Sequence, residues 1–467
     1  FVYATKGLTT GNIMNKITDL IKTNASTKDV IEKTNSYCPW LWNHLHVTTN
    51  GQVFPCCLGG GEASPIGNIN NESFDDIWTG PEFKKLRKAV LQDKKIPHCK
   101  TCYTKEQQSG FSLRHDAITK FHESAKDMVM TTQDDVTSPD AKPVYLDIRF
   151  SNICNMRCKM CGHFSSSKWF GDSEKLKEKG IYNYGTNSDT AIIKGIEDSD
   201  ALLDRLEEYL PHMQEIYFAG GEPLFMEQHY KLLNKLIELK LTDIHIRYNS
   251  NLSIVKFKKT KIVDLWKHFS NVYCAGSIDT YGTRAENLRK DTVWSEIETH
   301  MALIHSETPH VIVGISPTIQ ILNAHSVCEL NRQWVEKGWV RPDEMFWNIL
   351  IDPKFYNVQN FPDHMKQEVA EIWLDHLNWL GVRPHKTVYK TIHTAIKWMN
   401  SVPCNENRLR EMCYHTKILD QLRGEDTRCT FPELKYIWEN YWPPRSDELR
   451  SSVLAQICKF FSLGPLR

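Results

Sequence analysis

Two spacings of apolar residues run through the middle of the chain, one typical of strands and the other of helices. Short apolar or alternating segments predict six strands, at residues 144–150, 215–219, 243–249, 272–278, 311–319 and 344–351. Segments with apolar residues at helical spacing separate them, for example at 201–210, 230–239 and 297–304. Because strands that alternate with helices pair in parallel, this order predicts an α/β fold built on a parallel sheet.

The pattern changes on either side of this region. Residues 131–143 are polar and rich in Asp, Ser and Pro, which is typical of a linker. Beyond Pro353 the spacing becomes helical, with Val369, Trp373 and Leu377 on one stripe that continues to Leu380. We expect these helices to cover the α/β domain rather than to form a separate binding domain. The predicted parts are an amino-terminal domain at 1–130, the linker at 131–143, the α/β domain at 144–353 and a helical region at 354–467.

The amino-terminal domain is predicted to bring four cysteines together. Alternating segments at 44–48 and 52–57, joined by a turn at Asn50-Gly51, predict a β-hairpin that brings Cys38 and Cys56 close to each other. An amphipathic stretch with Phe83, Leu86 and Val90 on one face then leads to a Cys-x-x-Cys pair, Cys99 and Cys102. Four thiolates suit either a closed zinc site or a complete [4Fe–4S] cluster. On chemistry alone zinc is preferred, because structural zinc tolerates many such frameworks.

Three further cysteines, Cys154, Cys158 and Cys161, occupy one short loop directly after the strand predicted at 144–150. Three thiolates can hold three corners of an iron–sulfur cubane, which leaves the fourth iron open to a small molecule. The spacing also fits zinc ligands, or buried thiols that act as small apolar residues. The next predicted strand ends in a second motif, Gly220-Gly221-Glu222-Pro223, with two glycines and a carboxylate.

Together, the cysteine triplet and the Gly-Gly-Glu-Pro motif resemble the radical S-adenosylmethionine (SAM) superfamily. The resemblance implies a partial (β/α)6 TIM-like barrel, with the motifs at the carboxyl ends of strands. It also implies that SAM binds the open iron of a [4Fe–4S] cluster and is cleaved reductively to a 5′-deoxyadenosyl radical, which abstracts hydrogen from a substrate.

The same resemblance implies a set of SAM contacts. Glu222 would accept a hydrogen bond from the methionine ammonium, and Arg289 would pair with the SAM carboxylate. The alternative for Arg289 is a solvated charge on a helix. Met160 stands where the family usually has an aromatic residue near the adenine. The implied cofactor contacts are Gly220, Gly221, Glu222, Ser277, Asp279, Arg289 and Asn323, with Met160 beside them.

The amino-terminal cysteines resemble the twitch domain, a shortened relative of the SPASM domain that carries one auxiliary [4Fe–4S] cluster. The resemblance rests on Cys38, the spacing from Gly51 to Cys56, Gly67-Asn68-Ile69, the segment 74–78 and the closing Cys-x-x-Cys. It favours a cluster over zinc and implies the ligands Cys38, Cys56, Cys99 and Cys102, with Cys57 as an extra thiol. In most relatives this domain follows the barrel, whereas here it precedes it.

Composition narrows the class of protein. Lys plus Arg and Asp plus Glu both number 57, so nothing favours a nucleic-acid or an anionic membrane partner. The one basic cluster, at residues 256–261, is interpreted as the solvated start of a helix. No apolar run is long enough for a membrane span and no signal peptide is evident, which favours a cytoplasmic protein. Fourteen cysteines then argue for metal binding over disulfides, although Cys404, Cys413, Cys429 and Cys458 are widely spaced and are expected to be idle or buried thiols.

The substrate is the least defined part of the prediction. The resemblance implies a peptide side chain as substrate, with a carbohydrate or small metabolite as the alternative, and a reductant such as flavodoxin or ferredoxin. The absence of an evident leader-binding module at the amino terminus weakens the peptide prediction. The alternative from another functional class is a non-catalytic scaffold protein stabilised by zinc. Weak candidates for catalysis near strand ends are Cys274, His245 and Tyr248, together with Asn249 and Asn348, while His163 is expected to support the cluster loop or to face solvent.

Overall fold

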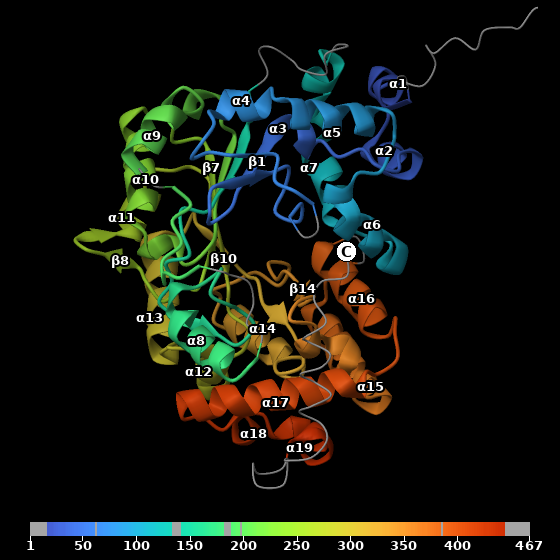
Figure 1. The fold of residues 1–467 in the computed structure, drawn as a ribbon, viewed down its shortest axis with the longest axis vertical. Helices are drawn as coiled ribbons and strands as arrows, with labels where there is room; N and C mark the ends of the chain where they lie inside the picture. Colours follow the sequence, from blue (N-terminus) through green and yellow to red (C-terminus); the bar gives the residue numbers. More distant parts are fainter. Residues whose placement is uncertain are drawn as a thin grey trace, which may run out of the picture. The chain divides into compact units, whose positions relative to one another are not determined.

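The computed structural model describes residues 16–60, 63–132, 142–181, 188–196, 199–383 and 386–443 (Figure 1). The chain forms two compact units, the first made of Phe1–Ile148 and Gly195–Tyr217 and the second of Arg149–Lys194 and Phe218–Arg467. These units do not follow the domain boundaries expected from the sequence, and that domain division stays a prediction. Most of the expected linker, at 133–141, lies outside the described residues.

The first unit is built on strands in the order β6 (Glu215–Phe218), β4 (Tyr145–Ile148), β1 (His44–Val47), β2 (Gln52–Phe54) and β3 (Gly67–Asn68). β1 and β2 pair antiparallel with His46 opposite Phe54, which confirms the predicted hairpin. Gly51 turns the chain with a φ of 78°, and a Cβ there would lie 2.4 Å from the carbonyl oxygen of Gly195. β1 also pairs in parallel with β4, a long-range pairing that the sequence analysis did not predict.

Helices of the first unit surround these strands. α5 buries Phe83, Leu86 and Val90, as its spacing predicts, and Ser73 caps α4 by accepting from the backbone N–H of Asp76. The helices are α1 (Lys16–Lys22), α2 (Thr27–Lys33), α3 (Trp40–Asn43), α4 (Phe74–Trp78), α5 (Pro81–Leu91), α6 (Lys100–Ser109), α7 (Leu113–Met130) and α9 (Ser199–Glu207), with short 3₁₀ turns η1 (Pro97–Cys99) and η3 (Leu210–His212).

The second unit contains three parallel strands in the order β12 (Ile312–Ile315), β10 (Val272–Gly276) and β7 (His245–Ser250). β7 alternates between buried and partly exposed residues, so that Tyr248 faces the interior opposite Cys274 of β10. Three short pairs complete the unit: β5 (Arg157–Cys158) with β11 (Arg289–Lys290), β8 (Lys256–Phe257) with β9 (Thr260–Lys261), and β13 (Thr318–Ile319) with β14 (Asn348–Ile349).

The mixed α/β architecture with parallel strands is as predicted, and each of the six predicted ranges overlaps a strand, mostly a shorter one. The segment predicted at 311–319 breaks into β12 and β13 around Pro317, which has no N–H to donate to a sheet. The strand predicted at 344–351 is reduced to β14, in which Asn348 and Ile349 pair with β13, while Met345 makes an isolated bridge to Ile315. A barrel of six units stays a prediction.

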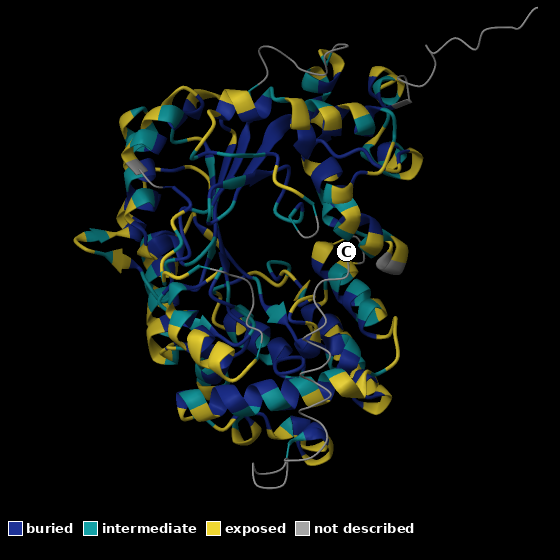
Figure 2. Cartoon of the chain, viewed as in Figure 1, coloured by how far each residue is buried: buried dark blue, intermediate teal, exposed yellow. Residues whose placement is uncertain are grey.

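Helices of the second unit become dominant beyond Pro353, as predicted. α15 buries Val369, Trp373 and Leu377 on one stripe, and Figure 2 shows the strands buried while the outer helix faces are exposed. None of the described helices has the length and apolar character that a membrane crossing requires. The helices are α8 (Phe170–Glu178), α10 (Glu227–Glu238), α11 (Ile262–Trp266), α12 (Gly282–Leu288), α13 (Trp294–Glu307), α14 (Val327–Glu336), α15 (Asp363–Leu380), α16 (Thr387–Met399), α17 (Glu406–Arg423), α18 (Thr427–Thr430) and α19 (Lys435–Tyr441), with 3₁₀ turns η2 (Ser167–Trp169), η4 (Pro223–Phe225), η5 (Lys354–Tyr356), η6 (Val358–Asn360) and η7 (Pro432–Leu434).

Candidate functional site

The three-cysteine loop of the second unit is packed and hydrogen-bonded. Cys154 and Cys158 are 8% and 4% exposed and pack with Met156, while Met160 and Cys161 lie partly buried against them. Cys158 lies in β5 opposite Arg289 of β11. The indole Nε1 of Trp169 donates to the carbonyl oxygen of Cys158 across 2.9 Å. The chain itself therefore holds the loop in place.

The thiols of this loop differ in acidity. A hydrogen bond from the Cys161 thiol, and then the positive charge of Arg289, lower the pKa of Cys158 to about 7. Burial raises the pKa of Cys154 to about 12. Because metals are bound by thiolates, Cys158 is the thiol of this loop best prepared as a ligand, whereas Cys154 would have to release its proton on binding.

The Gly-Gly-Glu-Pro segment lies directly against the cysteine loop. Gly221 has a φ of 54°, and a Cβ there would lie 2.2 Å from the carbonyl oxygen of Ile153. The backbone N–H of Glu222 donates to that same carbonyl across 2.8 Å. On the other side of Cys154, the side-chain amide of Asn251 donates to Asn155 Oδ1 across 2.9 Å. A side chain at position 221 would clash with the Ile153 carbonyl, so only glycine fits where the two motifs meet.

The Glu222 carboxylate is buried, with 1% of the residue exposed. It accepts hydrogen bonds from Ser250 Oγ at 2.8 Å and from the backbone N–H groups of Asn251 at 2.7 Å and Leu224 at 3.1 Å. Burial raises the pKa of Glu222 to about 7, against the lowering effect of these hydrogen bonds. A carboxylate offers about four acceptor positions, so one is left for a ligand.

Arg289 forms a buried ion pair with Asp279 and is not solvated. Its Nε and Nη2 donate to the two Asp279 oxygens across 2.7 and 3.0 Å, and its Nη1 lies 3.6 Å from Cys158 Sγ. The alternative of a solvated helix charge is wrong, because Arg289 is 7% exposed and lies in β11. Asn323 is fully buried, and its amide donates to the Asp279 carbonyl across 3.0 Å, so that it supports the Asp279 loop. The N–H of Ser277 donates to the Ser250 carbonyl across 2.7 Å.

The candidate substrate residues fall into two groups. Cys274 and Tyr248 are fully buried core positions, and the Tyr248 hydroxyl lies 2.9 Å from His229 Nε2. His245 and Asn249 alternate with them on the partly exposed side of β7, and Asn348 is exposed in β14. His163 is 3% exposed and its Nε2 lies 2.9 Å from the carbonyl oxygen of Ala191, which fits support of the loop and not exposure to solvent.

Lys159, between two of the cysteines, is a residue that the sequence analysis missed. It is fully buried, and its ammonium donates to Asp420, Glu425 and Thr427 across 3.1, 3.2 and 2.9 Å. Its partners follow 261 to 268 positions later in the chain, near the end of α17, between α17 and α18, and at the start of α18. The only signal in the sequence is a charged residue between two candidate ligands. The carboxy-terminal part of the chain thus anchors the cysteine loop.

The first unit gathers the amino-terminal thiols in an apolar surrounding. Cys38 and Cys56 pack with Trp40, Phe121 and Tyr145. Burial raises their pKa values well above the usual range, and Cys99 and Cys102 raise both further, so the four thiols lie within reach of one another's charge. Cys57 adds to the effect on Cys56.

The donor set of both sites consists of sulfur alone, which suits iron–sulfur chemistry. Among the described residues, no three His, Cys, Asp or Glu side chains surround a position for one metal ion. A closed zinc site needs four ligands around one ion at about 2.3 Å for sulfur. A cubane instead places each thiolate on a separate iron, and sulfur donors alone suit either kind of site.

Residues 38–103 match the iron–sulfur cluster-binding domain SPASM. The matched range begins at Cys38 and ends one residue beyond Cys102, so it contains all four expected ligands and Cys57. The match confirms the prediction of a SPASM-type iron–sulfur domain in the amino-terminal part of this chain.

The chain is also similar to solved structures, of which two are described here. Native anSMEcpe with bound AdoMet has a TM-score of 0.33 and 17% identity, over 49% of this chain and 58% of that one. SuiB of Streptococcus suis bound to S-adenosylmethionine has a TM-score of 0.36 and 14% identity, over 73% of this chain and 68% of that one. The chain therefore spans 58% of the length of the first. No curated protein matches the chain in sequence.

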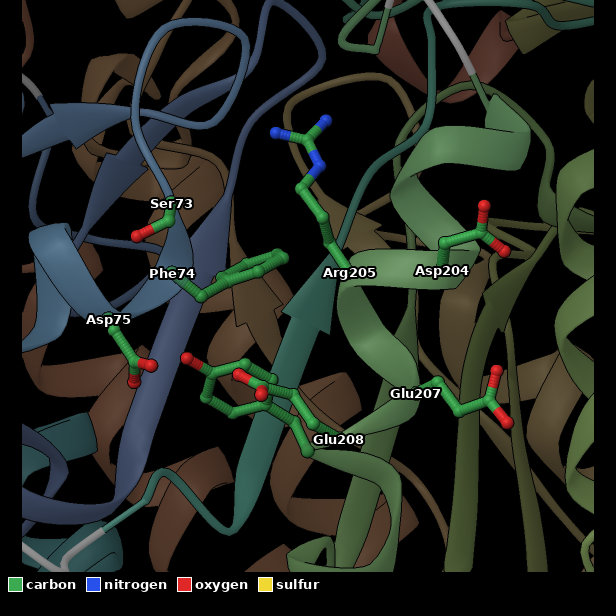
Figure 3. A pocket seen from close by; sticks show the side chains of 8 residues that line it. Ser73, Phe74, Asp75, Asp204, Arg205, Glu207 and Glu208 are labelled. Carbon is green, nitrogen blue, oxygen red and sulfur yellow. The ribbon is translucent and has the colours of Figure 1, made fainter.

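Two surface cavities are lined by other residues. One, of about 540 Å³ in the first unit, is bordered mainly by carboxylates, with Asp75 on one side and Asp204 and Glu207 on the other (Figure 3). The other, of about 680 Å³ in the second unit, includes Trp398 and Cys404. Neither contains an expected cluster or SAM contact.

Proposed function

We propose that this protein is a radical SAM enzyme that cleaves SAM reductively at the three-cysteine cluster and abstracts hydrogen from its substrate. The observation that carries the proposal is the joining of two motifs far apart in the sequence. Gly221 and Glu222 pack on the Ile153 carbonyl, next to Cys154, which puts a buried carboxylate beside the cysteine loop.

A SAM-bound cluster would supply one-electron cleavage of a sulfonium, which starts the radical chemistry. The residues of this chain would hold the reactants. Cys154, Cys158 and Cys161 would ligate three irons. Glu222, with one acceptor position left, would hold the methionine ammonium. Asp279 would position Arg289, whose Nη1 already lies beside Cys158 and would favour its thiolate form.

The SPASM-type domain would hold an auxiliary [4Fe–4S] cluster through Cys38, Cys56, Cys99 and Cys102. Its apolar surrounding of Trp40, Phe121 and Tyr145 excludes water from the thiolates, which protects a cluster from hydrolysis and shifts its potential. The proposed role is to accept or pass on an electron during substrate oxidation. The favoured substrate class is peptidyl, with a carbohydrate or small metabolite as the alternative, and a flavodoxin or ferredoxin as reductant.

The direct test is anaerobic reconstitution with iron and sulfide, followed by reduction with dithionite in the presence of SAM. We expect about eight irons per chain, as two cubanes require, and formation of 5′-deoxyadenosine that rises when the correct peptide or metabolite is added. A protein that binds one or two zinc ions, takes up no iron and does not respond to SAM would disprove the proposal.

Glu222→Gln is expected to weaken SAM binding about tenfold or more while the cluster stays intact, because a charge-assisted hydrogen bond is lost. The amide also brings a donor against the N–H groups of Leu224 and Asn251. Affinity can be measured from the change in the electron paramagnetic resonance spectrum of the reduced cluster as SAM is added. Glu296→Gln, an exposed carboxylate on α13, is the matched control. Equal affinity in the two variants would remove Glu222 from the SAM site.

A further inference from the structure

The basic cluster at residues 256–261 forms a hairpin instead of only the start of a helix. β8 and β9 pair antiparallel, with Lys256 opposite Lys261 and Phe257 opposite Thr260. Lys258 makes the turn with a φ of 53°, and Lys261 precedes α11. Figure 1 shows this hairpin projecting beyond α11, and Figure 2 shows that much of it is exposed. Four of its six residues are lysines in a chain whose net charge is zero.

The base of the hairpin is tied to the cysteine loop. It follows the carboxyl end of β7, where parallel sheets place their ligand sites. Ser253, three residues before Lys256, accepts a hydrogen bond from the side chain of Asn155 across 2.8 Å, and Asn155 is the residue after Cys154. Asn251 binds both Asn155 and Glu222, so the chain that leads into the hairpin borders the proposed SAM site.

The hairpin also packs on residues that follow the Gly-Gly-Glu-Pro segment. The ring of Phe257 lies 6.0 Å from that of Phe225 and 5.3 Å from that of Tyr230. Phe225 follows Glu222 by three residues and is 37% exposed. Aromatic residues are enriched at protein interfaces, so this ring beside the lysines of the hairpin suits a contact surface.

The charges of the hairpin are only partly neutralised within the chain. Lys258 pairs with Glu227 at 2.6 Å, and Lys261 lies 3.8 Å from Glu307. Lys256 and Lys259 are exposed and have no acidic partner within the described part of the chain. The positive face is therefore available to an anionic partner, which it would attract by long-range steering.

We infer that the β8–β9 hairpin, with Phe225 beside it, is the docking surface for an acidic protein electron carrier with a low-potential flavin or iron–sulfur centre. This inference rests on the proposed function, which requires one electron for each SAM cleaved. The reduced carrier gives up one electron and becomes oxidised, and the three-cysteine cluster gains it. Docking on the hairpin brings the carrier to the side of the molecule where Asn155 and Glu222 border that cluster.

The test compares two reductants in a charge-reversal variant. Lys256→Glu combined with Lys259→Glu is expected to raise the apparent KM for reduced flavodoxin about tenfold or more, in line with the loss of electrostatic steering. SAM cleavage driven by dithionite should stay unchanged, because a small ion needs no docking surface. The flavodoxin-driven rate of the unaltered protein should fall steeply with added salt, and that dependence should flatten in the variant.

Lys390→Glu combined with Lys397→Glu is the matched control, because it makes the same charge change on exposed lysines of α16. An unchanged KM in the hairpin variant, or an equal rise in the control, would overturn the inference. So would a hairpin variant that loses affinity for nucleic acid or acidic peptide but not for flavodoxin. If the unaltered protein forms no 5′-deoxyadenosine even with dithionite, the proposed function itself fails, which distinguishes the two failures.

Discussion

Replacing Cys154, Cys158 and Cys161 together by Ala is expected to abolish 5′-deoxyadenosine formation and to lower the iron content from about eight to about four per chain. The remaining iron would belong to the SPASM-type domain, whose four proposed cysteine ligands belong to the other compact unit. Iron and sulfide analysis, with spectra of the reduced protein, would measure both effects.

Cys404→Ala combined with Cys429→Ala serves as the control for loss of thiols. Both lie outside the two cysteine groups, and Cys404 donates a hydrogen bond to the Asn360 carbonyl. We expect this variant to keep its iron and its activity. Loss of all iron in the triple variant would mean that the amino-terminal thiols cannot hold a cluster alone. Retention of SAM cleavage would contradict the assignment of the three-cysteine loop.

Local chemistry in the sequence predicted those parts of the fold that depend on near neighbours. The hairpin at 44–54 follows from alternation around Asn50-Gly51, and α5 follows from the spacing of Phe83, Leu86 and Val90. The SPASM-type domain was recognisable because its four cysteines keep a fixed spacing, and the family match confirms it. Strands were predicted less well where Pro317 interrupts one and leaves β14 with only two paired residues.

The candidate site was predictable in its motifs and not in its long-range partners. Gly221 is easily recognised, but the reason that only glycine fits is the Ile153 carbonyl, which no local pattern reveals. Arg289 was expected at the ligand, whereas its charge is held by Asp279, ten positions earlier. Such pairings depend on how strands and loops come together in space. Sequence spacing therefore predicts the residues of the motifs better than it predicts the distant residues that pack against them or bond to them.

Lys159→Met is expected to destabilise the second unit by about 3 kcal/mol, because it leaves the buried Asp420 carboxylate without its cation. The Lys159 side chain is 0% exposed to solvent and pairs with Asp420 and Glu425, whose side chains are 8% and 10% exposed. Urea unfolding followed by tryptophan fluorescence should report the loss, since Trp169 donates to the carbonyl of the neighbouring Cys158. Iron in the three-cysteine site should be lost at a lower urea concentration than in the unaltered protein.

Two further variants separate a buried ion pair from simple packing. Lys290→Met removes a partner of the same Glu425, at 2.9 Å, but its side chain is 27% exposed, so we expect a loss below about 1 kcal/mol. Adding Asp420→Asn to Lys159→Met should recover part of the stability, because the unpaired buried charge is removed with its partner. If Asp420→Asn instead lowers the free energy of unfolding of Lys159→Met as much as it lowers that of the unaltered protein, the two residues act independently. The cysteine loop would then be held by its own hydrogen bonds, and α17 would serve only as a cover.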